Sequence, residues 1–146
     1  MVLLPIVDDG REGLLVVRRN IPPQVGSLAL VGGFIELSES WEDGVARELR
    51  EEVNVHVDAE ALVPFWFASS APDPRNILVF ATAPAMDARE LPPFEVNSES
   101  QERGVVFGPG GEAGADDGLA FPLHVEAVRR YFGARGVGGP LGFVRR

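Results

Sequence analysis

The sequence predicts an α/β fold in which a mixed β-sheet is sandwiched between helices. The first observation is the order of its segments, in which apolar strand-like stretches, an amphipathic helix, further strands and a final helix follow one another. The second is size, because 146 residues, 45% of them hydrophobic, can bury a core without disulfides. No internal repeat or second hydrophobic unit is evident, so we expect one domain over residues 1–146.

The first third of the chain predicts three strands. "LLPIV" (3–7), "DDGREG" (8–13) and "LLVV" (14–17) predict a strand, a polar turn and a second strand. "RRNIPPQVGS" (18–27) is a loop, because Pro-Pro and glycine break regular structure. "LALVGGFIEL" (28–37) predicts a short strand that two glycines interrupt, and these glycines allow positive φ or close backbone approach.

A helix is predicted over residues 41–53. Ser40 with Asp43 three positions later resembles a capping box, and Asn54 is suited to the left-handed position that ends a helix. The positions of the buried edge recur every four residues: Trp41, Val45, Leu49 and Val53. Glu48, Glu51 and Glu52 share a neighbouring face, on which Gly44 indicates close packing. A solvated face with i,i+4 ion pairs is the alternative reading of these glutamates.

The remainder of the chain predicts strands and a final helix. "VHVDAEALVPFWFAS" (55–69) and "NILVFATA" (76–83) are expected strands, joined by a turn at "SAPDPR" (70–75). A long acidic loop (86–104) leads to a short strand "VVF" (105–107), and "GPGGEAGADDG" (108–118) is flexible by composition. "PLHVEAVRRYFG" (122–133) predicts a helix with Val125, Val128 and Phe132 on one side.

Composition excludes several classes of function. Thirteen basic and 22 acidic side chains give a net charge of −9, which disfavours nucleic acid as a partner but permits a phosphate-bearing substrate bridged by a cation. There is no cysteine, hence no thiolate metal site or cysteine nucleophile. The N-terminal ten residues lack a signal peptide's basic and long apolar regions, and no stretch could span a membrane, so we expect a cytoplasmic protein.

One segment resembles the signature of a known family. In "GGFIELSESWEDGVARELREEVNV", Gly33 is followed after five residues by Glu39, and after seven more by Arg47-Glu48, Leu49, Glu51-Glu52, Asn54 and Val55. This resembles the Nudix hydrolase signature G-x5-E-x7-R-E-U-x-E-E-x-G-U, where U is a bulky aliphatic residue. Asn54 replaces the usual glycine and can serve the same left-handed helix end. The resemblance covers 23 residues and implies the Nudix-type α/β/α sandwich.

The resemblance implies Mg²⁺- or Mn²⁺-dependent hydrolysis of a nucleoside diphosphate linked to another moiety. By position, Glu51 and Glu52 match the principal metal ligands, and Glu48 matches a residue that binds metal or deprotonates water. The backbone carbonyl of Gly33 is an expected further ligand, and Glu39 with Arg47 is an expected structural pair. Mg²⁺ prefers such oxygen ligands. A further acidic residue is expected from the 86–104 loop, which offers Glu102, favoured, then Glu99 and Glu95, with three solvated side chains as the alternative.

The substrate is less defined. Arg18 and Arg19 are candidate phosphate contacts or surface residues, and Trp66 or Phe67 could stack on a base or belong to the core. Leu28 and Val31 stand where the family often has an aromatic residue and a proline. "SSAPDPRN" resembles the segment after the signature in ADP-ribose and NADH pyrophosphatases, which favours such substrates over nucleoside triphosphates. His56 and His124 have no expected role.

Two further expectations concern assembly and a rival function. The chain begins close to its first strand, so we expect no N-terminal segment for a swapped dimer, although a homodimer remains open. The alternative function is a catalytically weak nucleotide-binding or sensor module with the same fold. The retention of four signature glutamates favours the enzyme.

Overall fold

The computed structural model describes residues 1–70, 76–108, 118–136 and 142–146. Most of the turn expected at 70–75 and of the flexible segment expected at 108–118 therefore lies outside the described residues. Within the described ranges no helix has the length and apolar character needed to cross a bilayer.

The N-terminal strands form a hairpin that is central to the fold. β1 (Val2–Leu3) and β2 (Pro5–Asp8) are followed by β3 (Arg11–Arg19), and β2 pairs antiparallel with β3. Asp9 and Gly10 at the tip both have positive φ, 46° and 76°, a conformation that favours glycine and aspartate in two-residue hairpin turns. The predicted strand–turn–strand is confirmed.

The strands form two mixed sheets. One has the order β7-β2-β3-β8-β9, with β4 (Leu28–Ala29) also paired to β3, and the other has the order β1-β6-β5. The remaining strand bounds are β5 (Val63–Ser69), β6 (Ile77–Thr82), β7 (Met86–Asp87), β8 (Ser100–Phe107) and β9 (Gly142–Arg145). Each sheet contains one parallel pair, β1 with β6 in the smaller sheet and β2 with β7 in the larger, and the other strand pairs among the described residues are antiparallel.

Several predicted strand bounds were wrong. The strand expected over 28–37 is only the two residues of β4, since the chain leaves the sheet before Gly32. Residues 55–62 hold a short 3₁₀ helix, η1 (Ala59–Ala61), in which Glu60 N–H donates to the Asp58 side chain. The strand expected at 105–107 begins at Ser100, because polar side chains at 101–103 pair along β3 and hide its pattern.

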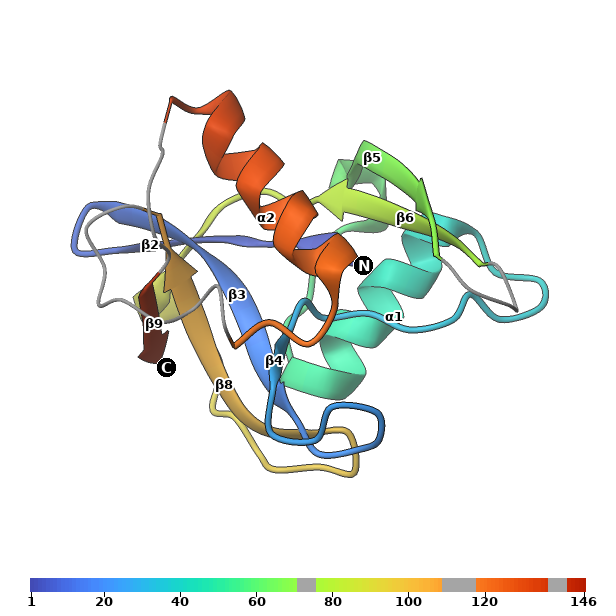
Figure 1. Cartoon of the computed structure of the whole chain (residues 1–146), viewed down its shortest axis with the longest axis horizontal. Helices are drawn as coiled ribbons and strands as arrows, with labels where there is room; N and C mark the ends of the chain where they lie inside the picture. Colours follow the sequence, from blue (N-terminus) through green and yellow to red (C-terminus); the bar gives the residue numbers. More distant parts are fainter. Residues whose placement is uncertain (71–75, 109–117, 137–141) are drawn as a thin grey trace.

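The two long helices cover opposite faces of the β3–β8 ladder. Alternate residues Leu15, Val17, Val105 and Phe107 pack in one core with α1 (Trp41–Val53). Leu14, Val16 and Val106 pack in a second core with α2 (Pro122–Ala134). Figure 1 shows α1 in teal and α2 in orange among these strands. The predicted α/β/α sandwich is confirmed. A second short 3₁₀ helix, η2 (Ala88–Glu90), precedes the long loop before β8.

Candidate active site

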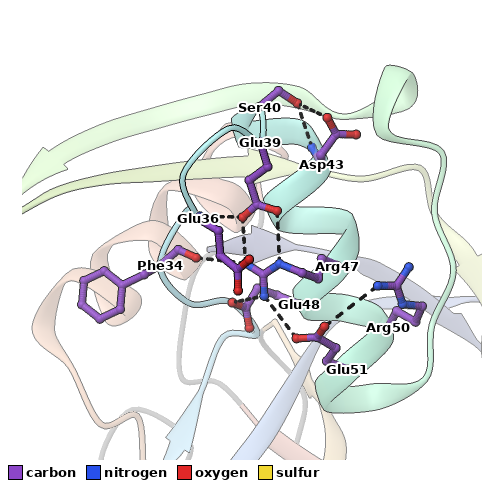
Figure 2. Close-up of polar contacts among 9 residues, drawn as sticks. All are labelled: Phe34, Glu36, Glu39, Ser40, Asp43, Arg47, Glu48, Arg50 and Glu51. Carbon is purple, nitrogen blue, oxygen red and sulfur yellow. Dashed lines mark hydrogen bonds and ion pairs between the residues drawn. The ribbon is translucent and has the colours of Figure 1, made fainter.

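The helix that carries the glutamates begins and ends as predicted. Asp43 N–H donates to the Ser40 hydroxyl at 3.1 Å, and that hydroxyl donates to the Asp43 carboxylate at 2.7 Å (Figure 2). At the other end Asn54 has φ 57° and ψ 24°, in the left-handed region, and its N–H donates to the Arg50 carbonyl. Local capping therefore fixes the register of the glutamate face.

Arg47 joins the loop before α1 to the helix and uses all five of its N–H donors. Its Nε and Nη2 form a bidentate pair with Glu39 at 3.1 and 2.8 Å, and Nη2 also donates to the Phe34 carbonyl. Nη1 donates to Glu48 at 2.9 Å and Glu51 at 3.1 Å. Figure 2 shows the guanidinium at the centre of these acceptors. Its hydrogen bonds hold the pKa of Glu39 below the ordinary value.

The loop between residues 33 and 40 lies tightly against α1. Glu36 N–H donates to Glu39 Oε1 at 2.7 Å. A Cβ added at Gly44 would lie 3.0 Å from that same oxygen, so the glycine lets the Glu39 carboxylate approach the helix. The close packing expected at Gly44 is thus supplied by Glu39.

Glu52 is the most buried of the three helix glutamates, with 9% of its surface exposed. Its Oε1 accepts from Gly32 N–H at 2.9 Å, and its Oε2 accepts from the Ser100 hydroxyl at 3.1 Å. The pKa of Glu52 is raised to about 7, first by burial and then by the charges of Glu48 and Glu99, although its two hydrogen bonds act in the opposite direction. The side chain is therefore held in place while its negative charge is destabilised.

Glu48 lies directly against the backbone of Gly33. A Cβ added at Gly33 would lie 2.3 Å from Glu48 Oε1, so no other residue fits beside this carboxylate as placed. Burial raises the pKa of Glu48, and the charges of Glu99 and Glu51 act in the same direction while Arg47 opposes them. Glu51 is the outermost of the three, with 53% of its side chain exposed.

The long loop brings Glu99, rather than Glu102, to these carboxylates. Glu102 lies on β8, where its oxygens pair with Arg18 at 2.6 Å and with Arg145 at 3.2 Å. Glu99 carries the charge that acts on both Glu48 and Glu52. Glu95 is exposed and, with Glu51 and Glu52, lines a neighbouring cavity of about 320 Å³.

The candidate substrate contacts are engaged within the chain. Besides its pair with Glu102, Arg18 donates to the Gly26 carbonyl at 2.8 Å. Arg19 donates to the Pro23 carbonyl at 2.9 Å, so both arginines brace the 20–27 loop. Trp66 is partly buried against the core that contains α2 residues, and it stacks on the core residue Phe80 with ring centroids 5.1 Å apart.

The other aromatic and histidine candidates divide between surface and core. Phe67 is 59% exposed. His56 is also exposed, whereas His124 is buried in α2, and its Nδ1 accepts from Leu30 N–H at 3.2 Å. Burial lowers the pKa of His124 to about 3, which keeps the ring neutral. His124 is therefore a core residue with a hydrogen-bonding partner that the sequence did not reveal.

Sequence reasoning missed three residues that touch Glu52. Gly32 N–H and the Ser100 hydroxyl bind its carboxylate, and the Asn97 side-chain amide donates to its main-chain carbonyl at 2.9 Å. The segment Asn-Ser-Glu-Ser at 97–100 does carry a turn signal, because asparagine side chains readily bond backbone N–H groups two or three residues on. The turn signal did not indicate that Asn97 and Ser100 contact Glu52 in α1.

The donor set fits a hard divalent cation. Glu48, Glu52 and Glu99 are oxygen donors, and the charge of Glu99 destabilises the ionised forms of Glu48 and Glu52, a repulsion that a cation relieves. Gly33 has no side chain that would displace the Glu48 carboxylate. As placed, no three histidine, cysteine, aspartate or glutamate side chains of the described ranges are gathered closely enough to hold a metal ion. Arg47 instead binds Glu48 and Glu51.

Known proteins resemble the chain in sequence and in fold. The family model for the NUDIX domain matches residues 1–107. An ADP-ribose pyrophosphatase from Methanocaldococcus jannaschii is 34% identical over 74 residues, which cover 51% of this chain and 43% of that protein. The chain thus matches less than half the length of this relative.

Two solved structures share the fold at higher coverage. A NUDIX hydrolase from Nitrosomonas europaea is 26% identical, with a TM-score of 0.62, over 95% of this chain and 73% of its own. The NUDIX domain of Shewanella oneidensis NrtR, solved with ADP ribose, is 26% identical with a TM-score of 0.57, over 68% of this chain and 66% of its own.

Proposed function

The chain belongs to the Nudix family, and from that premise we propose that it hydrolyses a pyrophosphate bond in a nucleoside diphosphate linked to another moiety, with Mg²⁺ or Mn²⁺. The observation that carries this proposal is the set of Glu48, Glu52 and Glu99, which we call the carboxylate cluster, in which the charge of Glu99 acts on both helix glutamates. Burial and the charges of Glu48 and Glu99 together raise the pKa of Glu52 to about 7. A protein retains such a destabilised group where a ligand of opposite charge stabilises it.

In this proposal Glu48, Glu51, Glu52 and the Gly33 carbonyl hold the cation. When bound, the cation neutralises substrate phosphate oxygens and lowers the pKa of the attacking water. Gly32 N–H and the Ser100 hydroxyl fix the direction of the Glu52 carboxylate. Glu48 is half-buried with a raised pKa, so it is suited to accept the proton of water as the general base. Arg47 orients Glu48 through one oxygen.

The overall chemistry is displacement at phosphorus. A water oxygen forms a bond to one phosphorus, the bridging anhydride oxygen leaves, and a carboxylate takes up the water's proton. We favour ADP-ribose- or NADH-like substrates over nucleoside triphosphates, because the M. jannaschii relative is an ADP-ribose pyrophosphatase and the NrtR domain was solved with ADP ribose. The net charge of −9 favours a small nucleotide rather than a nucleic acid as partner.

A second candidate is a module that binds a nucleotide without turning it over. One observation favours it: Arg47 occupies Glu48 and Glu51, and no three candidate ligands are gathered around a common point in the described part of the chain. If Arg47 kept these bonds in the presence of Mg²⁺, the proposed metal site would lack two of its ligands, Glu48 and Glu51.

A substrate panel separates the two candidates. The purified protein is incubated with Mg²⁺ and ADP-ribose, NADH, dinucleoside polyphosphates, nucleoside triphosphates or nucleotide sugars, and released phosphate, pyrophosphate and nucleoside monophosphate are quantified. The enzyme proposal expects turnover of at least one compound, abolished by chelator and restored by Mg²⁺. Binding by calorimetry without turnover across the panel would overturn it in favour of the module.

A further inference from the structure

The segment 97–100 is attached to the C-terminal end of α1 through the side chain of Asn97. Its Nδ2 donates to the Glu52 carbonyl at 2.9 Å. The last four carbonyls of a helix lack intrahelical partners, and this bond supplies one. The next carbonyl, that of Val53, accepts from Arg103 at 3.2 Å. The end of the helix is therefore held by side chains from the loop and from β8.

The other half of the Asn97 amide holds the turn that carries Glu99. Its Oδ1 accepts from Glu99 N–H at 3.0 Å and from Ser100 N–H at 2.9 Å. The Glu99 carbonyl in turn accepts from Asn20 N–H at 2.7 Å, so both main-chain groups of Glu99 have partners. Ser100, fully buried, donates its hydroxyl to Glu52 Oε2.

One amide thus joins the two elements that supply the carboxylate cluster. Its donor side binds the backbone of Glu52, its acceptor side binds the backbone of Glu99, and the adjacent hydroxyl binds the Glu52 carboxylate. The Glu99 charge acts on Glu48 and Glu52, so like-charge repulsion opposes the approach of this loop to α1, and the hydrogen bonds of Asn97 act against that repulsion.

We infer that Asn97 is a positioning residue that holds Glu52 and Glu99 together at the carboxylate cluster. This inference rests on the proposed function only for its effect on turnover. Its effect on the structure can be measured independently of the proposed function. Gly32 N–H donates to Glu52 Oε1, so protection of this amide depends on where the Glu52 carboxylate lies.

Two substitutions divide the role of the amide. Asn97→Ala removes both halves. Asn97→Asp keeps an acceptor for the Glu99 and Ser100 N–H groups but replaces the donor to Glu52 by a second oxygen. If Asn97 serves only the turn, Asn97→Asp should behave like the wild-type protein in the two measurements below. If the bond from Asn97 Nδ2 to the Glu52 carbonyl also matters, Asn97→Asp should not. Asn76→Asp is the matched control, because Asn76 is exposed, directly precedes β6 and bonds the Ser70 hydroxyl through its backbone N–H and carbonyl.

The first readout is hydrogen exchange of the Gly32 amide by NMR in the metal-free protein. Exchange at least about tenfold faster in Asn97→Asp than in Asn76→Asp, with global unfolding unchanged, is the expected result. Wild-type exchange at Gly32 in Asn97→Asp overturns the inference whether or not the protein is an enzyme. If Asn97→Ala fails to fold, Asn97→Asp, which keeps the turn, still decides the matter.

The second readout uses Mn²⁺ binding, followed by electron paramagnetic resonance, together with kcat and KM. We expect a weaker Mn²⁺ affinity in Asn97→Asp despite its added negative charge, and a kcat lowered about tenfold or more with a smaller change in KM. Affinity equal to or tighter than that of Asn76→Asp contradicts the inference. Absence of turnover in the wild-type protein would contradict the proposed function alone.

Discussion

Substituting Gly33 by alanine tests the placement of Glu48 without removing any charged group. The added Cβ would lie 2.3 Å from Glu48 Oε1, 2.7 Å from its carboxyl carbon and 2.9 Å from Oε2. Ordinary van der Waals contact begins at 3.4 Å, so Oε1 must move by about 1.1 Å, the difference between the two distances. The carboxylate is the far end of a flexible side chain, so it will give way before the backbone does.

We therefore expect stability and turnover to respond differently. Unfolding free energy should change by about 1 kcal/mol or less, because a side-chain rotation relieves the clash and Gly33 does not need positive φ. Turnover should fall about a hundredfold, since a misplacement of about 1 Å at a reacting group can cost that much. The displaced Oε1 is also the atom that accepts from Arg47. Affinity for Mn²⁺ should fall as well.

The assay compares kcat on the best substrate of the panel, Mn²⁺ affinity and urea unfolding for Gly33→Ala and for Gly133→Ala. Gly133 lies in α2 with no atom within 4 Å of an added Cβ, so its alanine should retain full activity and gain up to about 1 kcal/mol of helix stability. Turnover and Mn²⁺ affinity within twofold of wild type in a folded Gly33→Ala protein would refute the reasoning that Glu48 must lie beside this glycine.

Four further outcomes are expected. Glu52→Gln should lower turnover by orders of magnitude while the protein still folds. In the absence of metal, the free energy of unfolding of the wild-type protein should fall by up to about 3 kcal/mol as pH rises from 4.5 to 7. The reason is that the folded state keeps a proton on Glu52 that the unfolded state releases. Urea titrations of Glu52→Gln should not show this loss. His124 should make stability depend on pH in the opposite direction, because its pKa of about 3 in the folded protein lies below the ordinary 6.5. The free energy of unfolding should therefore fall by about 2–3 kcal/mol as pH drops from 6.5 to 4.5. In urea unfolding, His124→Asn should remove this dependence, since the asparagine oxygen can still accept from Leu30 N–H. Arg47→Lys should weaken Mn²⁺ binding and turnover, because an ammonium has three donors against the five in use, whereas the exposed Arg50→Lys should leave both unchanged in the same assays.

The sequence allowed a good prediction of those features that depend on local chemistry. The bounds of α1, its Ser40 cap and its left-handed end at Asn54 follow from residues within one turn of each feature, and all are confirmed. The family resemblance implied the pair of Glu39 with Arg47, and the cost of a glycine inside a helix indicated close packing at Gly44; both contacts are present in the structure. The helix ends could be predicted because each cap depends on residues only three or four positions apart.

Features that depend on the pairing of distant segments were not predictable in the same way. On β8, Glu102 lies opposite Arg18, and the register then shifts so that Ser100 lies opposite Arg19. Glu102 is consequently used in a cross-strand ion pair. Glu99, in the turn before β8, and Ser100, the first residue of β8, act on Glu52 of α1 instead. A single sequence shows three acidic residues in this loop but does not contain the strand register that selects among them.

The same reasoning explains why the glutamate run of α1 is ambiguous when taken alone. Glu51 with Arg47 is an i,i+4 ion pair of the kind found on solvated helices, and it is half-exposed. Glu52 differs because the 97–100 segment covers it, and Glu48 differs because the backbone at Gly33 approaches it. Neither neighbour belongs to the helix. The helix sequence supplies the three carboxylates. Two loops then exclude water from Glu48 and Glu52, which would otherwise be solvated like Glu51.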